Sequence, residues 1–313
     1  MERMGENGRP KAVVIAGPTA SGKTGLSVDL ASALGGEIVN ADAMQVYRGM
    51  DVGTAKPTAH EQKGVPHHLL DVVDPDEEFN AAIYRSMALP RIREISSKGT
   101  PCFVVGGSGL YIKSLLGGLF ACPPSDSALR EALRREFEDL ENKELHERLN
   151  RLDPESAGKI HPNDRLRIIR AFEIVRLTHR LPSDLGSEHG FTDRALNALT
   201  LCLDVDRELL YRRINARTVS MVESGLKEET EALLRQGYSP DLKPMKAIGY
   251  RHMIRYLKGQ VSLEETIHTM QRDTRRYAKR QLTWFRTDPG AVWVAPENFD
   301  FILQTIRHLY YLD

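Results

Sequence analysis

The chain has 313 residues, enough for one large domain or two smaller ones. A chain of this length can bury a core that is stable without disulfide bonds or a structural metal. Its 43 basic and 43 acidic residues give a formal net charge of zero, which excludes a protein that is basic throughout but not a local basic face. No apolar run approaches the ~20 residues that would span a membrane, and residues 1–10 lack the apolar core of a secretory signal. The sequence therefore predicts a cytoplasmic protein without a membrane segment.

Strand-like and helix-like segments alternate in the first third of the chain. Parallel sheets covered by helices show this alternation. We expect strands over Lys11–Ala16, Gly36–Asp42 and Pro101–Val105, helices over Thr24–Leu34 and Asn80–Ser97, and then an apolar run over Leu110–Leu116.

A charged, helical region begins after Gly118, where Pro123 and Pro124 interrupt the chain. Apolar residues at helical spacing predict further helices in it. We expect a helix or helix pair over Ser125–Arg151, a helix over Asn163–Thr178 with Asn163 as N-cap, and a loop over Pro182–Gly190. Strand character returns at Ala198–Val205, followed by a helix over Asp206–Val222 and a last strand at Ala291–Ala295.

The predicted fold class is α/β, with a P-loop parallel sheet flanked by helices, a helical insertion domain and a helical C-terminal part. The expected boundaries are 1–118 with 198–313 for the α/β core and 119–197 for the insertion.

The three cysteines, Cys102, Cys122 and Cys202, are far apart and form no C-x-x-C pair, which indicates reduced thiols or small buried apolar residues.

A phosphate-binding motif follows the first predicted strand. Every fixed position of G-x-x-x-x-G-K-[ST] is present, and the segment precedes a helix. Glycines let the backbone turn its N–H groups inward, the helix adds its positive end, and lysine adds a cation. The candidate pyrophosphate ligands are Gly17, Pro18, Thr19, Ala20, Ser21, Gly22, Lys23 and Thr24. Thr24 is also the candidate Mg²⁺ ligand.

The motif indicates a polyphosphate and leaves the class of enzyme open. A kinase, a nucleoside triphosphatase and a transferase with a pyrophosphate leaving group all satisfy it. Asp42 ends the second predicted strand, at the edge where α/β proteins bind ligands. From the sequence alone, Asp42 is a turn or helix-capping aspartate or, in a kinase, a Mg²⁺ ligand. The adjacent His67 and His68 would point to opposite faces of a strand, which argues against a metal pair.

A series of motifs in one order, from about residue 11 to 286, resembles the tRNA dimethylallyltransferases. Residues 42–48 (DAMQVYR) and 50–57 (MDVGTAKP) are similar to the family's D-S-x-Q-V-Y-R and M-D-I-G-T-A-K-P. Residues 106–111 (GGSGLY) resemble G-G-T-G-L-Y, and residues 246–251 (KAIGYR) resemble a C-V-G-Y-R element. Residues 274–284 (TRRYAKRQLTW) resemble T-R-x-x-A-K-R-Q-x-T-W, and residues 66–71 and 161–164 add shorter matches.

The sequence departs from the family pattern at a few positions. Ala43 stands where the family has Ser, Ser108 replaces Thr and keeps the hydroxyl, and Leu166 replaces Gln. No zinc motif follows residue 286, which implies a bacterial-type member.

The resemblance implies transfer of a dimethylallyl group from dimethylallyl pyrophosphate to the N6 amine of adenine 37 of tRNA, beside the anticodon, with Mg²⁺ as cofactor. It implies three catalytic residues, Asp42 as the base, Lys23 and Arg217, in a protein that we expect to be a monomer. The implied contacts with the anticodon stem-loop are Asp42, Ala43, Met44, Gln45, Ser108, Leu166, Arg167, Ile168, Ile169, Arg170, Lys246, Gly249, Tyr250, Arg251, Arg275, Lys279, Arg280 and Gln281.

Residues 271–286 hold six cations and one anion in a chain of zero net charge, which favours phosphate contact over a solvated face. Three rival hypotheses remain at this point. A small-molecule kinase would bind ATP in the P-loop but leaves this basic segment unexplained. An adenylate isopentenyltransferase would need neither the insertion nor the basic segment, and a non-catalytic RNA-binding module would not need Lys23, Thr24 and Asp42.

Overall fold

The computed structural model describes residues 8–119, 126–189 and 193–311. The chain divides into two compact units, residues 1–116 with 195–313 and residues 117–194, each of which is described here by itself. Cys122, Pro123 and Pro124 lie outside the described residues, whereas Cys102 and Cys202 are buried free thiols. Among the described residues no helix has the length and apolarity to cross a membrane.

The first unit is built on a six-stranded parallel sheet. Its order is β3-β2-β4-β1-β5-β6. The strands are β1 (Lys11–Ala16), β2 (Glu37–Asn40), β3 (His67–His68), β4 (Cys102–Gly106), β5 (Asn197–Leu203) and β6 (Ala291–Val294). Central β1 pairs with β4 and β5, and its last five residues are buried, as expected for a strand covered on both faces.

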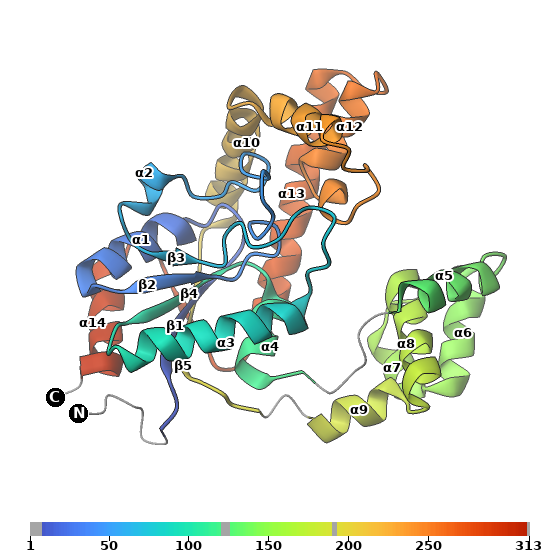
Figure 1. Cartoon of the computed structure of the whole chain (residues 1–313), viewed down its shortest axis with the longest axis horizontal. Coiled ribbons are helices and arrows are strands. Elements are labelled where there is room, and N and C mark those ends of the chain that lie inside the picture. Colours follow the sequence, from blue (N-terminus) through green and yellow to red (C-terminus); the bar gives the residue numbers. More distant parts are fainter. Residues whose placement is uncertain (1–7, 120–125, 190–192, 312–313) are drawn as a thin grey trace. The chain divides into compact units, whose positions relative to one another are not determined.

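Helices cover both faces of this sheet (Figure 1). On one face, α1 (Lys23–Leu34) and α14 (Phe299–Tyr311) pack against Val13, Ile15 and Phe103. Helix α3 (Ala81–Ser97) contacts β1, β2 and β4, and α4 (Gly109–Gly117) follows β4 directly. This arrangement leaves the carboxyl ends of the strands to carry ligand-binding loops. The short helix α2 (Ala59–Gln62) lies in the connection from β2 to β3.

The C-terminal part of the first unit is helical. It contains α10 (Arg207–Glu223), α11 (Leu226–Arg235), the 3₁₀ turn η1 (Pro244–Lys246), α12 (Tyr250–Leu257) and the long α13 (Leu263–Phe285). Helices α10 and α13 pack together through Leu210, Ile214 and Ala278. The basic segment predicted from the sequence therefore belongs to α13, whose buried side packs against α10.

The second unit consists of helices. These are α5 (Ser127–Glu136), α6 (Asn142–Leu152), α7 (Pro154–Lys159), α8 (Arg165–Thr178) and α9 (Pro182–His189). Leu133, Leu145, Leu149 and Ile168 form the centre of its own apolar core. The periodicity over Ser125–Arg151 thus corresponds to a helix pair.

Three local expectations were wrong. Pro182–Gly190 is helical as far as His189, because proline suits the first turn of a helix, and Leu185 is buried. The N-cap of α8 is Asp164, whose carboxylate accepts from Arg167 N at 3.2 Å, whereas Asn163 lies one residue before it. Strand β2 ends at Asn40, so Asp42 lies two residues beyond the strand.

Candidate active site

The P-loop lies at the carboxyl end of β1, at the start of α1. Gly17 has φ 146° and Gly22 has φ 94°, conformations that side chains other than glycine rarely adopt. A Cβ at Gly17 would also lie 3.3 Å from the backbone nitrogen of Leu203. Gly22 is the N-cap of α1, so the N–H groups of the first helical turn and the positive end of the helix dipole face the loop.

Lys23 folds back over this loop. Its ammonium donates to the carbonyl oxygens of Gly17 at 3.0 Å and Pro18 at 2.7 Å. Burial lowers the pKa of Lys23 to about 8; the positive charge of Arg217 acts in the same direction, while Asp42 opposes both effects. The cation is therefore held by dipoles inside the loop, in surroundings where a bound anion would strongly favour the charged form.

Two hydroxyl groups of the P-loop are available to a polar ligand. Ser21 is completely buried, and its Oγ has no hydrogen-bond partner among the described residues. Thr24, in the first turn of α1, is partly exposed. A buried hydroxyl without a partner is costly, and a phosphate oxygen in the loop would satisfy it.

Asp42 lies in the turn after β2, and its backbone is fixed by Asn40. Asn40 Oδ1 accepts from the Asp42 N–H at 3.1 Å, and Asn40 Nδ2 donates to the carbonyl oxygens of Asp42 and Leu69. The Asp42 carboxylate accepts from the Met44 N–H at 2.8 Å through Oδ1. This carboxylate is half-buried and held in one orientation at the edge that carries the P-loop.

The loop after β4 joins this turn through Ser108. Its Oγ accepts from the Ala43 N–H at 2.9 Å, and its own N–H donates to the carbonyl oxygen of Ala41 at 3.3 Å. A Cβ at Gly106 would lie 2.1 Å from that same oxygen, so only glycine permits this approach. The predicted residues 42–45 and 108 are therefore neighbours, although 65 residues separate Ala43 from Ser108.

Arg217 and Tyr277 add charge and aromatic character around Asp42. Burial lowers the pKa of the Arg217 guanidinium, and the negative charge of Asp42 opposes that shift. Burial raises the pKa of the Tyr277 hydroxyl, and Asp42 raises it further. Lys23, Arg217 and Tyr277 therefore all feel the charge of Asp42. Tyr277 was not among the predicted site residues, and its place one helical turn before Gln281 was the available signal.

Helix α13 contacts the P-loop and the loop after β4 directly. Gln281 accepts from Thr19 N at 2.9 Å and donates to the carbonyl oxygen of Gly107 at 2.9 Å. Trp284 packs against Gly109, the first residue of α4, where a Cβ would lie 2.1 Å from the indole ring. The structure thus brings Gln281 to the P-loop, which its predicted role as an RNA contact did not anticipate.

The other predicted RNA contacts of the first unit divide into exposed and buried groups. Lys246, Arg251, Lys279 and Arg280 are exposed, while Arg275 is partly buried and donates to Asn215 Oδ1 at 2.6 Å. Tyr250 and Gly249 are buried. The Tyr250 hydroxyl donates to Glu229 at 2.6 Å, and the side chain fills the space above Gly53. Gln45 is partly buried and donates to the carbonyl oxygens of Thr54 and Ala55.

Glu229 holds the segment that follows this turn. Its carboxylate accepts from the N–H groups of Asp51, Val52 and Gly53 at 2.8–3.0 Å, as well as from Tyr250. No sequence pattern indicates this set of bonds, because about 177 residues separate the partners. Together with Asn40, Glu229 is a positioning residue that motif analysis missed.

The predicted contacts in the second unit lie along α8. Leu166 is 69% exposed and Arg167 is exposed, whereas Ile168 and Ile169 are buried in the unit's core. Arg170 forms an ion pair of 2.9 Å with the fully buried Glu173, which also accepts two hydrogen bonds from Arg130. The exposed side of α8 therefore carries Leu166 and Arg167.

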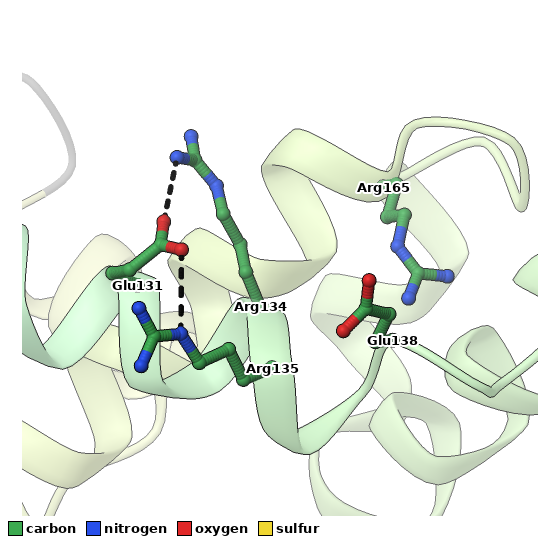
Figure 2. Close-up of a pocket in the computed structure, with 5 residues that line it drawn as sticks. All are labelled: Glu131, Arg134, Arg135, Glu138 and Arg165. Atoms are coloured by element: carbon green, nitrogen blue, oxygen red, sulfur yellow. Dashed lines mark hydrogen bonds and ion pairs between the residues drawn. The ribbon is translucent and has the colours of Figure 1, made fainter.

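A polar hollow of about 290 Å³ also lies in the second unit (Figure 2). It is lined by Glu131, Arg134, Arg135, Glu138 and Arg165. Figure 2 shows the Glu131 carboxylate between two of these arginines, with ion pairs of 3.5 Å to Arg134 and 3.6 Å to Arg135. Arg165 donates to the carbonyl oxygen of Leu140 at 2.9 Å, and none of the residues implied by the motifs lines the hollow.

Known proteins resemble this chain over almost its whole length. The IPP transferase family matches residues 45–288. A tRNA dimethylallyltransferase 2 of Geotalea uraniireducens is 52% identical over 92% of this chain and 94% of its own, and a tRNA dimethylallyltransferase of Geobacter sulfurreducens is 52% identical over 94% and 95%.

Solved structures agree with these sequence matches. A tRNA isopentenylpyrophosphate transferase of Bacillus halodurans superposes with a TM-score of 0.72 at 41% identity, covering 96% of this chain and 97% of its own. A eukaryotic dimethylallyltransferase acting on tRNA gives a TM-score of 0.78 at 28% identity over 95% and 77%. The motifs, the sheet with its P-loop and these matches agree, and the chain belongs to the IPP transferase family.

Proposed function

We propose that this protein transfers a dimethylallyl group from dimethylallyl pyrophosphate to the N6 amine of adenine 37 in tRNA and releases pyrophosphate. The observation that carries the proposal is the meeting of a complete phosphate cradle and the half-buried Asp42 carboxylate at one edge of one sheet. Membership of the IPP transferase family and about 50% identity to tRNA dimethylallyltransferases support the same activity.

At the donor, the reaction requires stabilisation of the negative charge on the leaving pyrophosphate. The allylic C–O bond of the donor breaks as charge builds on the leaving pyrophosphate, so fixed dipoles and cations at that place lower the barrier. The P-loop N–H groups, Lys23 and Arg217 are the groups of this chain that would take up that charge. Thr24 and the buried Ser21 hydroxyl would add hydrogen bonds or a metal contact.

At the acceptor, the reaction requires removal of a proton from the adenine amine. The exocyclic amine of adenine is a weak nucleophile and becomes acidic only while its nitrogen bonds to the allylic carbon. Asp42 would accept that proton, which completes the balance: a C–O bond breaks, an N–C bond forms, and the proton goes to the carboxylate. Hydrogen bonds from Asn40 and Met44 fix the orientation of Asp42 for this task.

A Mg²⁺ ion suits the donor site together with its pyrophosphate. Mg²⁺ prefers oxygen ligands and often takes only one or two from the protein. Thr24 offers one such oxygen, and the described residues contain no cluster of three or more acidic, His or Cys side chains that would hold the ion alone. Bound there, the ion would neutralise charge on the pyrophosphate.

The RNA partner would be the anticodon stem-loop of tRNA. A base in a loop can be turned out of its stack and inserted into an enclosed site, which the position of Asp42 requires. The exposed cations of α13 and the exposed side of α8 would contact phosphates. We infer that the protein acts as a monomer in the cytoplasm.

The test is incubation with labelled dimethylallyl pyrophosphate and unmodified tRNA, followed by nucleoside analysis. Label in N6-(dimethylallyl)adenosine at position 37 is the expected result. The alternative is a small-molecule kinase, which would turn over ATP without tRNA. Robust ATP hydrolysis without prenyl transfer would therefore overturn the proposal.

A further inference from the structure

The C-terminal basic helix, α13, has an inner side that touches both loops of the donor site. Tyr277 and Gln281 follow one another at helical spacing on this side, and Trp284, which is 38% exposed, lies one turn further along against Gly109. Arg276, Lys279 and Arg280, by contrast, are exposed. One helix therefore carries exposed cations and a set of contacts to the catalytic loops.

Gln281 is the central contact of the inner side. It is only 6% exposed, and both polar atoms of its amide are used within the protein. Thr19 N can only donate and the carbonyl of Gly107 can only accept, so the orientation of the amide is fixed by its partners. Because each amide atom already has a partner inside the protein and the side chain is only 6% exposed, Gln281 is poorly placed to contact RNA.

The two bonds of Gln281 join the P-loop to the loop after β4. These two segments approach closely, because a Cβ at Gly107 would lie 3.3 Å from the carbonyl oxygen of Gly17 and 2.3 Å from Gln281 Nε2. Ser108, the next residue, accepts from the N–H of Ala43, which follows Asp42 directly. A chain of contacts thus runs from the phosphate cradle through Gln281 to the proposed base.

We propose that Gln281 is a positioning residue that sets the distance between the donor cradle and Asp42. The inference rests on the proposed function, and it gives Gln281 a role other than contact with tRNA. An error of about 1 Å in the placement of reacting groups can lower a rate ~10²-fold, so removal of this amide would mainly lower the chemical rate. Affinity for tRNA, which the exposed cations would supply, would stay nearly constant.

The test compares three variants by single-turnover transfer, donor KM and tRNA binding. Gln281→Met keeps the length and the helix propensity of the side chain and removes both bonds. Gln281→Glu keeps an acceptor for Thr19 N but places negative charge beside the pyrophosphate cradle. Gln271→Met is the matched control, because Gln271 lies on the same helix and donates to the carbonyl oxygen of Asn215 at 3.2 Å.

We expect Gln281→Met to lower the single-turnover rate about 10- to 100-fold at saturating substrates, with the tRNA Kd within about twofold of wild type. Gln281→Glu should raise the donor KM more than Gln281→Met does, because like charges repel at the cradle. A purely structural role would lower the melting temperature and the tRNA affinity along with the rate, whereas a positioning role lowers the rate at saturation with both of these unchanged. Gln271→Met should resemble wild type.

Three results would overturn the inference. The first is that Gln281→Met binds tRNA more weakly but keeps the wild-type rate at saturation. The second is that both Gln281 variants have wild-type rate, donor KM and tRNA Kd. The third is that Gln271→Met loses as much rate as Gln281→Met. Should Gln281→Met fail to fold, Gln281→Glu retains one bond and gives the same comparison of rate with affinity. Absence of prenyl transfer by the wild-type protein would instead refute the proposed function, so the two failures are distinguishable.

Discussion

The charged side chains differ in burial between two regions of the molecule. These regions are the edge of the first unit that carries the P-loop and the surface of the helical second unit. At the edge, Lys23, Arg217 and Asp42 are partly or largely buried and influence one another's electrostatics. On the second unit, exposed acidic and basic side chains pair along the helices, as Glu144 does with Arg148. Electrostatic interactions are strong in a site of low dielectric and weak on a screened surface.

This difference separates two tasks that one RNA-modifying enzyme must perform. Charges at the edge are placed to change the energy of a transition state. Charges on exposed helices can supply affinity, and their effect falls as salt concentration rises. Variants at the edge should therefore change rates, and variants on the surface should change affinities.

The largest expected effect is that of Lys23→Ala. Loss of the cation inside the P-loop removes charge stabilisation from the leaving pyrophosphate, and transfer should fall at least ~10³-fold. Lys63→Ala is a suitable control, because Lys63 forms an exposed ion pair of 2.8 Å with Asp29. Initial rates of labelled transfer measure both variants, and substantial activity in Lys23→Ala would remove the lysine from the mechanism.

Asp42→Asn should come next. Asparagine keeps the size of the side chain and an acceptor for Met44 N but cannot take the proton, so the single-turnover rate should fall ~10²- to 10⁴-fold, or roughly 3–5 kcal/mol. Binding of tRNA should fall only modestly. Loss of donor affinity with recovery of the rate at high Mg²⁺ would instead make Asp42 a metal ligand, as in the kinase alternative.

The pH dependence of donor use should reflect Lys23. Burial lowers the pKa of this lysine to about 8, so the free enzyme loses the ammonium charge as pH rises through that value. We expect kcat/KM for the donor to fall about tenfold per pH unit above pH ~8. In Lys23→Arg, whose guanidinium stays charged, this bend should disappear; a flat wild-type profile to pH ~9.5 would show that Lys23 does not titrate there.

Glu173→Gln should destabilise the second unit by about 1–3 kcal/mol, because it leaves Arg130 and Arg170, both about one-third exposed, without their buried carboxylate. Burial alone would raise the pKa of Glu173, but hydrogen bonds from the two arginines outweigh it and lower the pKa. The stabilisation should thus be complete above the unfolded pKa of ~4.3 and be lost as pH falls through the lower folded value.

The measurement is thermal unfolding of Glu173→Gln and of a matched variant, Glu136→Gln. Glu136 forms an exposed ion pair of 3.2 Å with Arg176, so its replacement should cost less than about 1 kcal/mol. Equal stability of the two variants would show that burial adds nothing to the Glu173 cluster.

The smallest expected effects are those of single cations of α13, the exposed Lys279 and the partly buried Arg275. Arg275→Ala or Lys279→Ala should weaken tRNA binding severalfold and reduce the slope of log Kd against log salt by about one unit for each phosphate that the variant no longer binds. Arg93→Ala, an exposed arginine of α3, serves as the control. Wild-type affinity and slope in both α13 variants would make this side of the helix a solvated face.

Sequence patterns predict what depends on near neighbours along the chain. The apolar run of β1, the P-loop before α1 and the helical pattern of α3 are local features, and the structure contains all three. Helix α9 was predicted as a loop, because proline often interrupts a helix. Pro182 instead lies in the first turn of α9, where proline is compatible with helical structure.

Contacts between distant segments could not be predicted in this way. Gln281 and Thr19 are 262 residues apart, and no periodicity indicates that their atoms meet. The family resemblance marked Gln281 as functional but assigned it to RNA, since motifs record which residues matter and not what they touch. Asn40 belonged to a predicted strand and to no motif, so its bonds to Asp42 and Leu69 required the fold.

The most direct measurement is single-turnover prenyl transfer at saturating donor and tRNA, with Asp42→Asn and Lys279→Ala beside wild type. Saturation hides a loss of affinity, so this rate reports the chemistry at the edge alone. The account predicts a fall of at least ~10²-fold for Asp42→Asn and a wild-type rate for Lys279→Ala. A wild-type rate for Asp42→Asn, or an equal fall in both variants, would contradict the division between the buried charges of the edge and the exposed charges of the helices.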